Sequence, residues 1–193
     1  MFETRYWVWD SILSEELCDS IILESDKLLF GEGQIGGNVI NGQNLIAHQD
    51  NKIRNTNISF FDPHHWIHGI CLHYATTANF NAKWNFELSY PQNVQYAKYF
   101  PDQHYAPHSD DLIRKDCNEM RKLSVAIQLS NPNDYEGGDF IIENDIGEYE
   151  LLQNFRKRGS VIVFPSVIKH GILPVVRGVR HSVVCWVVGP KFR

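Results

Sequence analysis

The stretch Lys122-Leu-Ser-Val-Ala-Ile-Gln-Leu-Ser130 alternates between two kinds of side chain at every second position. Side chains of a β-strand point alternately to its two faces, so this period of two predicts a strand. One face carries Leu123, Val125, Ile127 and Leu129, and the other carries Ser124, Ala126 and Gln128. We therefore expect a strand with one apolar face and one mixed face.

Strand-like runs surround this stretch from Trp84 to the C-terminus. They are Val94–Tyr99, Asp139–Glu143 and Glu148–Leu152 as a hairpin, Ser160–Phe164 and Arg180–Val188. Pro132–Gly138 is expected to be a polar turn, because its Gly-Gly pair suits positive φ. Shorter strands are expected earlier, at Tyr6–Trp9 and Asn57–Phe61.

The first part of the chain instead predicts two helices. Ser14 is a good N-cap for the first, and Pro63, just after Asp62, suits the first position of the second. Helices followed by many short strands predict an α+β fold whose core is an antiparallel double-sheet, jelly-roll-like barrel.

Composition limits the class of protein. A chain of 193 residues, 43% apolar and 21% charged, fits one domain over 1–193, with helices and a loop in 1–85 and the barrel in 86–193. The net charge of -5 argues against a nucleic-acid partner. No leader or membrane-spanning run is recognisable, and the four cysteines show no disulfide or metal spacing, so a cytoplasmic protein with free thiols is expected.

The segment from Gly31 to Asn51 is rich in Gly, Asn and Gln and has no dinucleotide-binding pattern. Its plain interpretation is a long loop. The functional interpretation is a lid that closes over a substrate, as in many enzymes. The sequence does not decide between the two.

His108-Ser-Asp110 is the candidate metal-binding motif. On a strand, a histidine and a carboxylate two positions apart point to the same face. With one more histidine they would form the two-histidine, one-carboxylate set that suits iron(II) and leaves coordination positions open. The chain has nine histidines, so accidental pairs are common. Four of them, His64, His65, His68 and His73, are expected at the surface or boundary of the second helix.

His170 and Arg180 are the two downstream residues that could complete a site around His108 and Asp110. His170 follows the expected strand 160–164 and its turn, where a scaffold often presents functional groups. Arg180 shares a strand face with Ser182, Val184 and Trp186. An arginine in such an apolar strand needs a carboxylate, and no acidic residue is nearby in sequence, so a ligand could supply it.

Several short segments resemble one enzyme family. They are Tyr99–Asp110 (YFPDQHYAPHSD), Arg121–Ser130 (RKLSVAIQLS), Tyr135–Asp139 (YEGGD), Gly159–Ser166 (GSVIVFPS), His170 and Arg180–Trp186 (RHSVVCW). Their order and spacing resemble the Fe(II)- and 2-oxoglutarate-dependent dioxygenases, specifically the prolyl 4-hydroxylase-like branch. The resemblance covers roughly residues 90 to 190; each segment is weakly specific alone, whereas together they are strongly specific.

The resemblance implies a double-stranded β-helix and assigns roles residue by residue. His108, Asp110 and His170 would be the iron ligands. Arg180 would pair with the distal carboxylate of 2-oxoglutarate. Tyr99, Gln128 and Trp186 match positions that line the cosubstrate pocket. Gln128 and Trp186 could equally well be side chains that only fill the interior of the barrel.

One position departs from the family pattern. Asp102 stands where relatives commonly carry glycine; it is expected in a turn, and aspartate tolerates turn geometry. Asp110 is intact, which leaves no vacancy for a halide and favours hydroxylation over halogenation.

The resemblance implies a hydroxylase that uses Fe(II), 2-oxoglutarate and O2, with ascorbate as reductant. The expected substrate is a prolyl residue in a peptide or protein. Alternatives are a free amino acid or small molecule as substrate, a non-catalytic 2-oxoglutarate-binding module, and a cupin-like barrel with another divalent metal. Arg180 argues against the last, because that cation suits a cosubstrate carboxylate. Substrate identity and oligomeric state do not follow from the sequence.

Overall fold

A seven-stranded antiparallel sheet is the larger of the two main sheets of the molecule. The computed structural model describes residues 2–35, 39–40, 43–44, 48–111 and 118–191. In spatial order the strands are β1 (Trp7–Trp9), β13 (Val161–Pro165), β9 (Glu119–Gln128), β16 (Arg180–Pro190), β7 (Gln95–Tyr99), β6 (Asn57–Phe60) and β2 (Gly31–Glu32). The clean alternation that predicted a strand at 122–130 is thus confirmed by β9, which lies third in this order.

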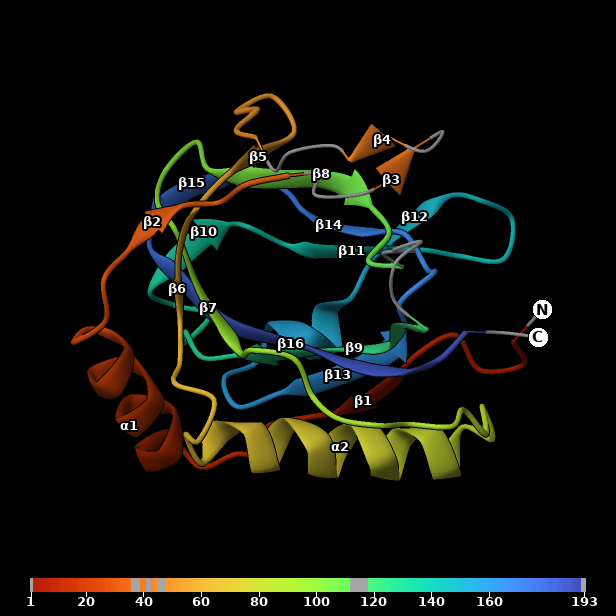
Figure 1. Ribbon diagram of the computed structural model, residues 1–193. Coiled ribbons are helices and arrows are strands. Elements are labelled where there is room, and N and C mark those ends of the chain that lie inside the picture. Colours follow the sequence, from red (N-terminus) through yellow and green to blue (C-terminus); the bar gives the residue numbers. More distant parts are fainter. Residues whose placement is uncertain (1, 36–38, 41–42, 45–47, 112–117, 192–193) are drawn as a thin grey trace.

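A five-stranded antiparallel sheet lies opposite the first (Figure 1). Its strands, in order, are β12 (Tyr149–Leu151), β11 (Phe140–Glu143), β14 (His170–Ile172), β8 (His104–His108) and β5 (Arg54–Asn55). Two short pairs complete the strands: β10 (Tyr135–Gly137) with β15 (Val175–Gly178), and β3 (Val39–Ile40) with β4 (Gln43–Asn44). The two facing sheets make the expected double-sheet barrel.

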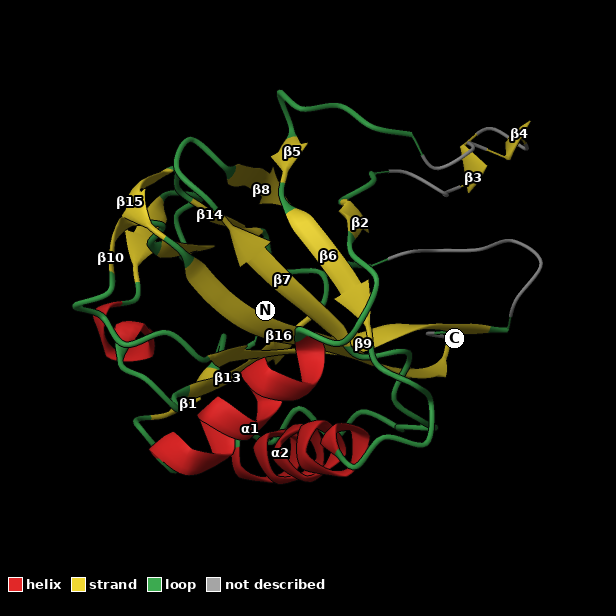
Figure 2. Ribbon diagram, turned by 90° about the vertical axis from the view of Figure 1, so that its left-hand side faces the viewer, coloured by secondary structure: helices red, strands yellow, loops and turns green. Residues whose placement is uncertain are grey.

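Two helices cover the outer face of the seven-stranded sheet, as Figure 2 shows. The first, α1 (Glu15–Ser25), begins where expected, and its N-cap Ser14 accepts a hydrogen bond from the Leu17 amide. The second, α2 (Ile67–Asn81), packs against β9, β13 and β16. A 3-10 turn, η1 (Gln153–Arg156), joins β12 to β13.

The two faces of β9 belong to two different cores. Its apolar face, from Leu123 to Leu129, packs with buried α-helical residues such as Ile21 and Cys71. Its other face looks into the barrel, where Ala126 packs with Phe140 and Phe164. The period of two in the sequence therefore separates the helical support from the barrel interior.

The second helix starts later than the sequence predicted. Asp62 caps a turn instead, because its carboxylate accepts a hydrogen bond from the His64 amide and its carbonyl accepts one from the His65 amide. Pro63 therefore precedes the helix, which begins at Ile67. Local side-chain capping, which competes with helix formation, accounts for the difference.

Turn geometry supports two other expectations. Gly137 and Gly138 adopt positive φ, as their place in a turn predicted, although β10 takes up part of that segment. Asp102 has a φ of 67° and its amide donates to the Val175 carbonyl. This is the left-handed region in which glycine is most at ease and aspartate is tolerated.

Three of the four cysteines, Cys18, Cys71 and Cys185, are buried free thiols, as expected, whereas Cys117 lies outside the described residues. The proposed lid over 31–51 lies partly outside them as well, at 36–38, 41–42 and 45–47. Among the helices that are described, none combines the length and apolar character needed to cross a membrane.

Candidate metal centre

His108, Asp110 and His170 come together at one end of the barrel. Their candidate ligand atoms all lie within 4.8 Å of one another. Nε2 of His108 is 3.5 Å from Oδ1 of Asp110, and Nε2 of His170 is 3.4 Å from Oδ2 of the same carboxylate. Within the described chain this is the one group of three or more such side chains. The downstream histidine that the sequence singled out is therefore the one that reaches the motif.

Strand pairing explains how residues 62 positions apart meet. His108 ends β8 and is paired in register with His170, which begins β14. Neighbouring antiparallel strands bring such pairs within side-chain contact, and the two imidazole centroids are 4.4 Å apart.

Asp110 is positioned differently from the sequence-based expectation. It lies beyond the end of β8 rather than on the strand, so period-two alternation does not orient it. Its amide donates to the Ser166 carbonyl at 2.8 Å, and its Oδ2 accepts a hydrogen bond from the Ser124 hydroxyl at 2.8 Å. The opposite sheet thus holds this carboxylate in place.

Backbone carbonyls orient both imidazoles. Nδ1 of His108 lies 3.0 Å from the Ala106 carbonyl, and Nδ1 of His170 lies 3.1 Å from the Ile168 carbonyl. A carbonyl only accepts, so each Nδ1 must carry the proton and each Nε2 presents a lone pair towards Asp110. That is the tautomer a metal-binding histidine requires.

The protonation states also suit a cation. Burial lowers the pKa of His170 to about 4, which keeps this imidazole neutral near pH 7. Burial by itself would raise the pKa of the Asp110 carboxyl, but His170 and His108 outweigh it and the net shift is downward. Neutral imidazoles and an ionised carboxylate are the forms that bind a metal, so the residues present fit an iron(II) site.

Arg180 lies deeper in the barrel and has no acidic partner among the described residues. It is 2% exposed, its Nη1 donates to the Ser182 hydroxyl at 3.1 Å, and its guanidinium lies 5.6 Å from the centroid of the Tyr99 ring. β16 and β7 pair Arg180 directly with Tyr99. A buried guanidinium without a carboxylate is costly, so a carboxylate ligand fits here.

An inner cavity connects this arginine with the metal-binding side chains. Its lining includes Tyr99, Arg180, Ser182 and Trp186 together with His108, Asp110 and His170. Tyr99, Arg180 and Trp186 thus line one cavity with the candidate metal-binding side chains, and their roles in binding the cosubstrate stay predictions. The indole Nε1 of Trp186 is buried with no hydrogen-bond partner in the described chain.

Gln128 lies outside that inner lining. Its amide Nε2 donates to the Tyr135 hydroxyl at 3.0 Å and contacts the Ser130 carbonyl at 3.3 Å. Its Oε1 has no described hydrogen-bond partner, and it shares a small neighbouring cavity with Arg180. A role in binding the cosubstrate stays a prediction for this residue.

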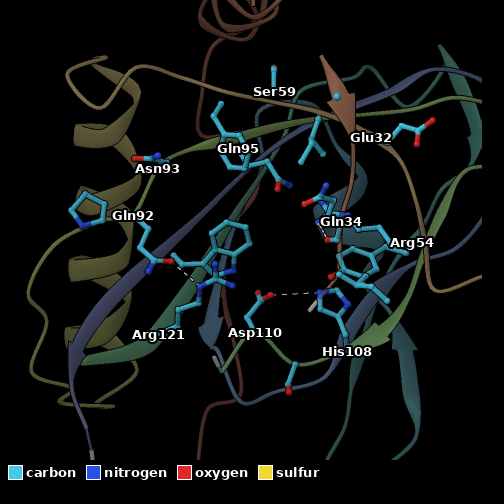
Figure 3. A pocket seen from close by; sticks show the side chains of 18 of the residues that line it. Glu32, Gln34, Arg54, Ser59, Gln92, Asn93, Gln95, His108, Asp110 and Arg121 are labelled. Carbon is cyan, nitrogen blue, oxygen red and sulfur yellow. Dashed lines mark hydrogen bonds and ion pairs between the residues drawn. The ribbon is translucent and has the colours of Figure 1, made fainter. Parts of the chain in front are cut away.

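A larger outer cavity, about 1030 Å³, opens above the metal-binding side chains (Figure 3). Arg54, Gln95, Tyr105 and Trp186 line both the outer and the inner cavity, as do His108 and Asp110. The two cavities therefore meet at the candidate metal centre. A reactant held in the outer cavity would reach the centre from a cavity that Arg180 does not line.

Several residues of the site were not singled out from sequence. Ser124 had one available signal, because it is a polar residue on the barrel-facing side of β9. Tyr105 stacks on His108 with ring centroids 3.6 Å apart, and the Arg54 guanidinium lies 4.6 Å from the centroid of Tyr105. No local pattern indicates Arg54, since only the pairing of β5 with β8 brings it there.

The histidines near α2 behave as predicted. His64 and His73 are exposed, and His65 and His68 are half-buried. They belong to no potential metal-binding group among the residues described. The expectation that these four lie at the surface or at its boundary is confirmed.

Sequence comparison relates the barrel to one superfamily. Residues 94–188 match the family model described as the 2OG-Fe(II) oxygenase superfamily. A PKHD-type hydroxylase of Crocosphaera subtropica is 33% identical over 96 residues, which are 49% of this chain and 42% of the relative. The chain thus spans less than half the length of this relative.

Solved structures share the fold over nearly the whole chain. A viral collagen prolyl hydroxylase from Paramecium Bursaria Chlorella virus-1, in complex with 2OG, aligns with a TM-score of 0.68, 19% identity and 97% coverage of both chains. A prolyl hydroxylase from Trichoplax adhaerens, in complex with a hypoxia inducible factor peptide fragment, aligns with a TM-score of 0.65, 16% identity and coverage of 96% and 84%. At this identity the likeness concerns the fold, and it confirms the double-stranded β-helix.

Proposed function

Residues 94–188 of this chain belong to the 2OG-Fe(II) oxygenase superfamily, and from this membership we propose that the protein is an iron- and 2-oxoglutarate-dependent dioxygenase that hydroxylates a prolyl residue in a peptide or protein. One observation carries the proposal. The His108, Asp110 and His170 cluster and an arginine without an acidic partner among the described residues line the same cavity. Neither feature alone indicates this chemistry, whereas together they match a metal chelated by a keto acid.

The metal would be held by Nε2 of His108, Nε2 of His170 and the carboxylate of Asp110. Three protein ligands on one face leave the remaining positions open to reactants. When bound, iron(II) with 2-oxoglutarate and O2 supplies the oxidising power for C–H hydroxylation. The chain itself contributes the orientation of the ligands and their protonation states.

Arg180 would bind the distal carboxylate of 2-oxoglutarate. Its guanidinium is already fixed by the Ser182 hydroxyl and by the Tyr99 ring, so little side-chain freedom would be lost on binding. Apolar barrel residues such as Phe140 and Phe164 line the same cavity and exclude water from it. A dry site strengthens the charge pairing between guanidinium and carboxylate.

The size of the outer cavity supports a peptide as substrate. At about 1030 Å³ it reaches the upper end of typical small-ligand pockets and can accommodate a stretch of chain. Two of the solved neighbours are prolyl hydroxylases by their descriptions, and one of them holds a peptide fragment. A free amino acid or small molecule is the second candidate substrate. The intact His-Asp-His cluster argues against a non-catalytic module.

The proposal is tested by incubating the purified protein with Fe(II), ascorbate, 2-oxoglutarate and a panel of proline-containing peptides. We expect succinate to form together with a +16 Da product. The His170→Ala variant should form neither, whereas the matched variant His64→Ala, which changes an exposed histidine, should behave as the unchanged protein. Failure to convert 2-oxoglutarate with any peptide or small acid would reject the proposal.

A further inference from the structure

Two arginines line the outer cavity of this acidic chain. The protein carries a net charge of -5, yet Arg54 and Arg121 are the cationic residues that line this cavity, opposed by the exposed Glu32 and by Asp110. Asp110 is already committed to the histidine cluster. Of the other charged residues that line the cavity, two are arginines and one is an exposed glutamate.

Arg54 lies at the junction of the two cavities and is 6% exposed. Its Nη1 donates to the Gln34 carbonyl at 3.1 Å, and its Nε is buried without a hydrogen-bond partner in the described chain. No carboxylate among the described residues pairs with it. Burying a cation without an anion is unfavourable, so this position favours an anionic ligand.

The Arg54 side chain is held firmly despite its missing partner. Its guanidinium lies 4.6 Å from the centroid of Tyr105, and Tyr105 stacks on His108. Tyr105 thus contacts both Arg54 and the candidate metal ligand His108. An anion bound by Arg54 would consequently lie close to the reacting position.

Arg121 approaches the same space from the opposite side, as Figure 3 shows for Arg54 and Arg121 about Asp110 and His108. Its Nε donates to Oε1 of Gln92 at 2.8 Å, and its guanidinium stacks on Trp186 at 3.8 Å. Its terminal nitrogens make no hydrogen bond to any described group, so they are available to a ligand.

Gln95 adds a neutral recognition group between the two arginines. The residue is 4% exposed, it lines both cavities, and its side-chain amide makes no hydrogen bond within the described chain. An amide can donate to and accept from a peptide group. The cavity thus combines one group suited to a peptide backbone with two suited to a carboxylate.

We propose that the substrate is an acidic peptide, in which the side chain of an aspartate or glutamate near the hydroxylated residue is bound by Arg54, with Arg121 contributing from the other side. This inference rests on the proposed function and narrows its substrate class. Arginine is suited to the role because its planar fork pairs with both oxygens of a carboxylate.

The test measures binding without turnover. The protein is loaded with Mn(II) and 2-oxoglutarate without oxygen, and labelled seven-residue peptides with one central proline are titrated by fluorescence anisotropy. Each peptide carries Glu at one flanking position and is matched by a peptide with Gln there. We expect Glu at one or more positions to lower the Kd about tenfold or more, because a charge-assisted hydrogen bond is lost with Gln. Added salt should reduce this preference.

Variants of the cavity residues test whether the preference for Glu peptides arises in the outer cavity. Arg54→Gln should abolish the preference for Glu over Gln peptides, and Arg121→Gln should reduce this preference. Arg54→Glu should instead favour peptides that carry Lys. The matched control Arg177→Gln changes an exposed arginine on β15 and should leave the preference for Glu peptides intact. Retention of the wild-type preference in a folded Arg54→Gln would overturn the assignment.

The titration of the wild-type protein tests the preference for acidic peptides even if a variant does not fold. Equal binding of Glu and Gln peptides at every position overturns the proposal, as does binding of free glutamate or proline with no peptide binding. Tight binding of acidic peptides without succinate formation would reject the proposed function, whereas the assignment of Arg54 as a binding site for an acidic peptide would stand.

Discussion

The hydroxyl of Ser124 donates a hydrogen bond of 2.8 Å to Oδ2 of Asp110, across the space between the two sheets. Asp110 lies beyond the end of its own strand, so this contact and its backbone bond to Ser166 replace the orientation that a strand would give. Ser124 also lies 3.0 Å from the Ser166 hydroxyl, and both serines are fully buried. The carboxylate of the candidate metal centre is thus fixed by residues that do not bind the metal themselves.

Ser124→Ala should lower metal affinity about 10- to 100-fold, because Asp110 loses the group that orients it. The measurement is a metal titration by calorimetry or by the metal-induced rise in Tm. Ser59→Ala is the matched control, since the Ser59 hydroxyl is also buried but has no hydrogen-bond partner among the described residues. Equal affinities of Ser124→Ala and wild type would show that the carboxylate is held by its backbone alone.

Metal binding should stabilise the fold. A ligand present at 100 times its Kd stabilises a protein by about 2.7 kcal/mol, so Mn(II) or anaerobic Fe(II) should raise the Tm and a chelator should reverse the rise. Asp110→Ala and His108→Ala should lose most of the effect, whereas His73→Ala, at an exposed position on α2, should keep it. A Tm that does not respond to metal would contradict the ligand assignment.

Arg180→Ala should weaken 2-oxoglutarate binding about tenfold or more, because the distal carboxylate loses a charge-assisted pairing. Arg180→Lys should recover part of the affinity. Calorimetry with the Mn(II) protein measures this directly, and the metal-induced rise in Tm should be unchanged in both variants. The same titration of Gln128→Ala should show a smaller effect, since Gln128 lies outside the inner lining. An unchanged affinity in Arg180→Ala would place the cosubstrate elsewhere.

Stability should fall as the pH drops from about 6.5 towards 4. Burial, followed by the charge of Lys98, lowers the pKa of His181 to about 4, so the unfolded chain binds this proton at a higher pH than the folded chain. The His181 contribution is fully present above the unfolded pKa and declines through that window by at most about 1.4 kcal/mol per pH unit. Tm measured from pH 7 to pH 4.5 should therefore fall less steeply in His181→Gln. His64→Gln, at an exposed position, should retain the wild-type slope.

Replacing Asp102 by glycine should destabilise the protein less than replacing it by alanine. Its φ of 67° lies in the left-handed region, where a non-glycine residue costs about 1–2 kcal/mol. Asp102→Gly should leave the free energy of unfolding nearly unchanged, and Asp102→Ala should lower it by about 1 kcal/mol. Urea unfolding measures both. A more stable alanine variant would show that the strain at this turn is negligible.

The alternation of side chains along the sequence made the long strands predictable, whereas the pairing register of the strands brings the site residues together. The residues of β9 and β16 sort onto two faces in the sequence as they do in the fold, because a strand has only two faces. The predicted start of α2 at Pro63 was four positions too early, because Asp62 caps a turn that competes with the helix. His170 and Arg180 could be singled out by their residue types and their places at strand ends.

By itself, the sequence determined the two helices, the longer strands and their two faces, and the candidate ligands His108, Asp110 and His170. Only the tertiary structure decided which groups surround them. Ser124, Arg54 and Arg121 enter the site through the pairing of β9, β5 and β8 with distant strands, and such long-range contacts leave no local pattern in a sequence. Local periodicity encodes which face a residue lies on, whereas packing of the two sheets determines what that face meets.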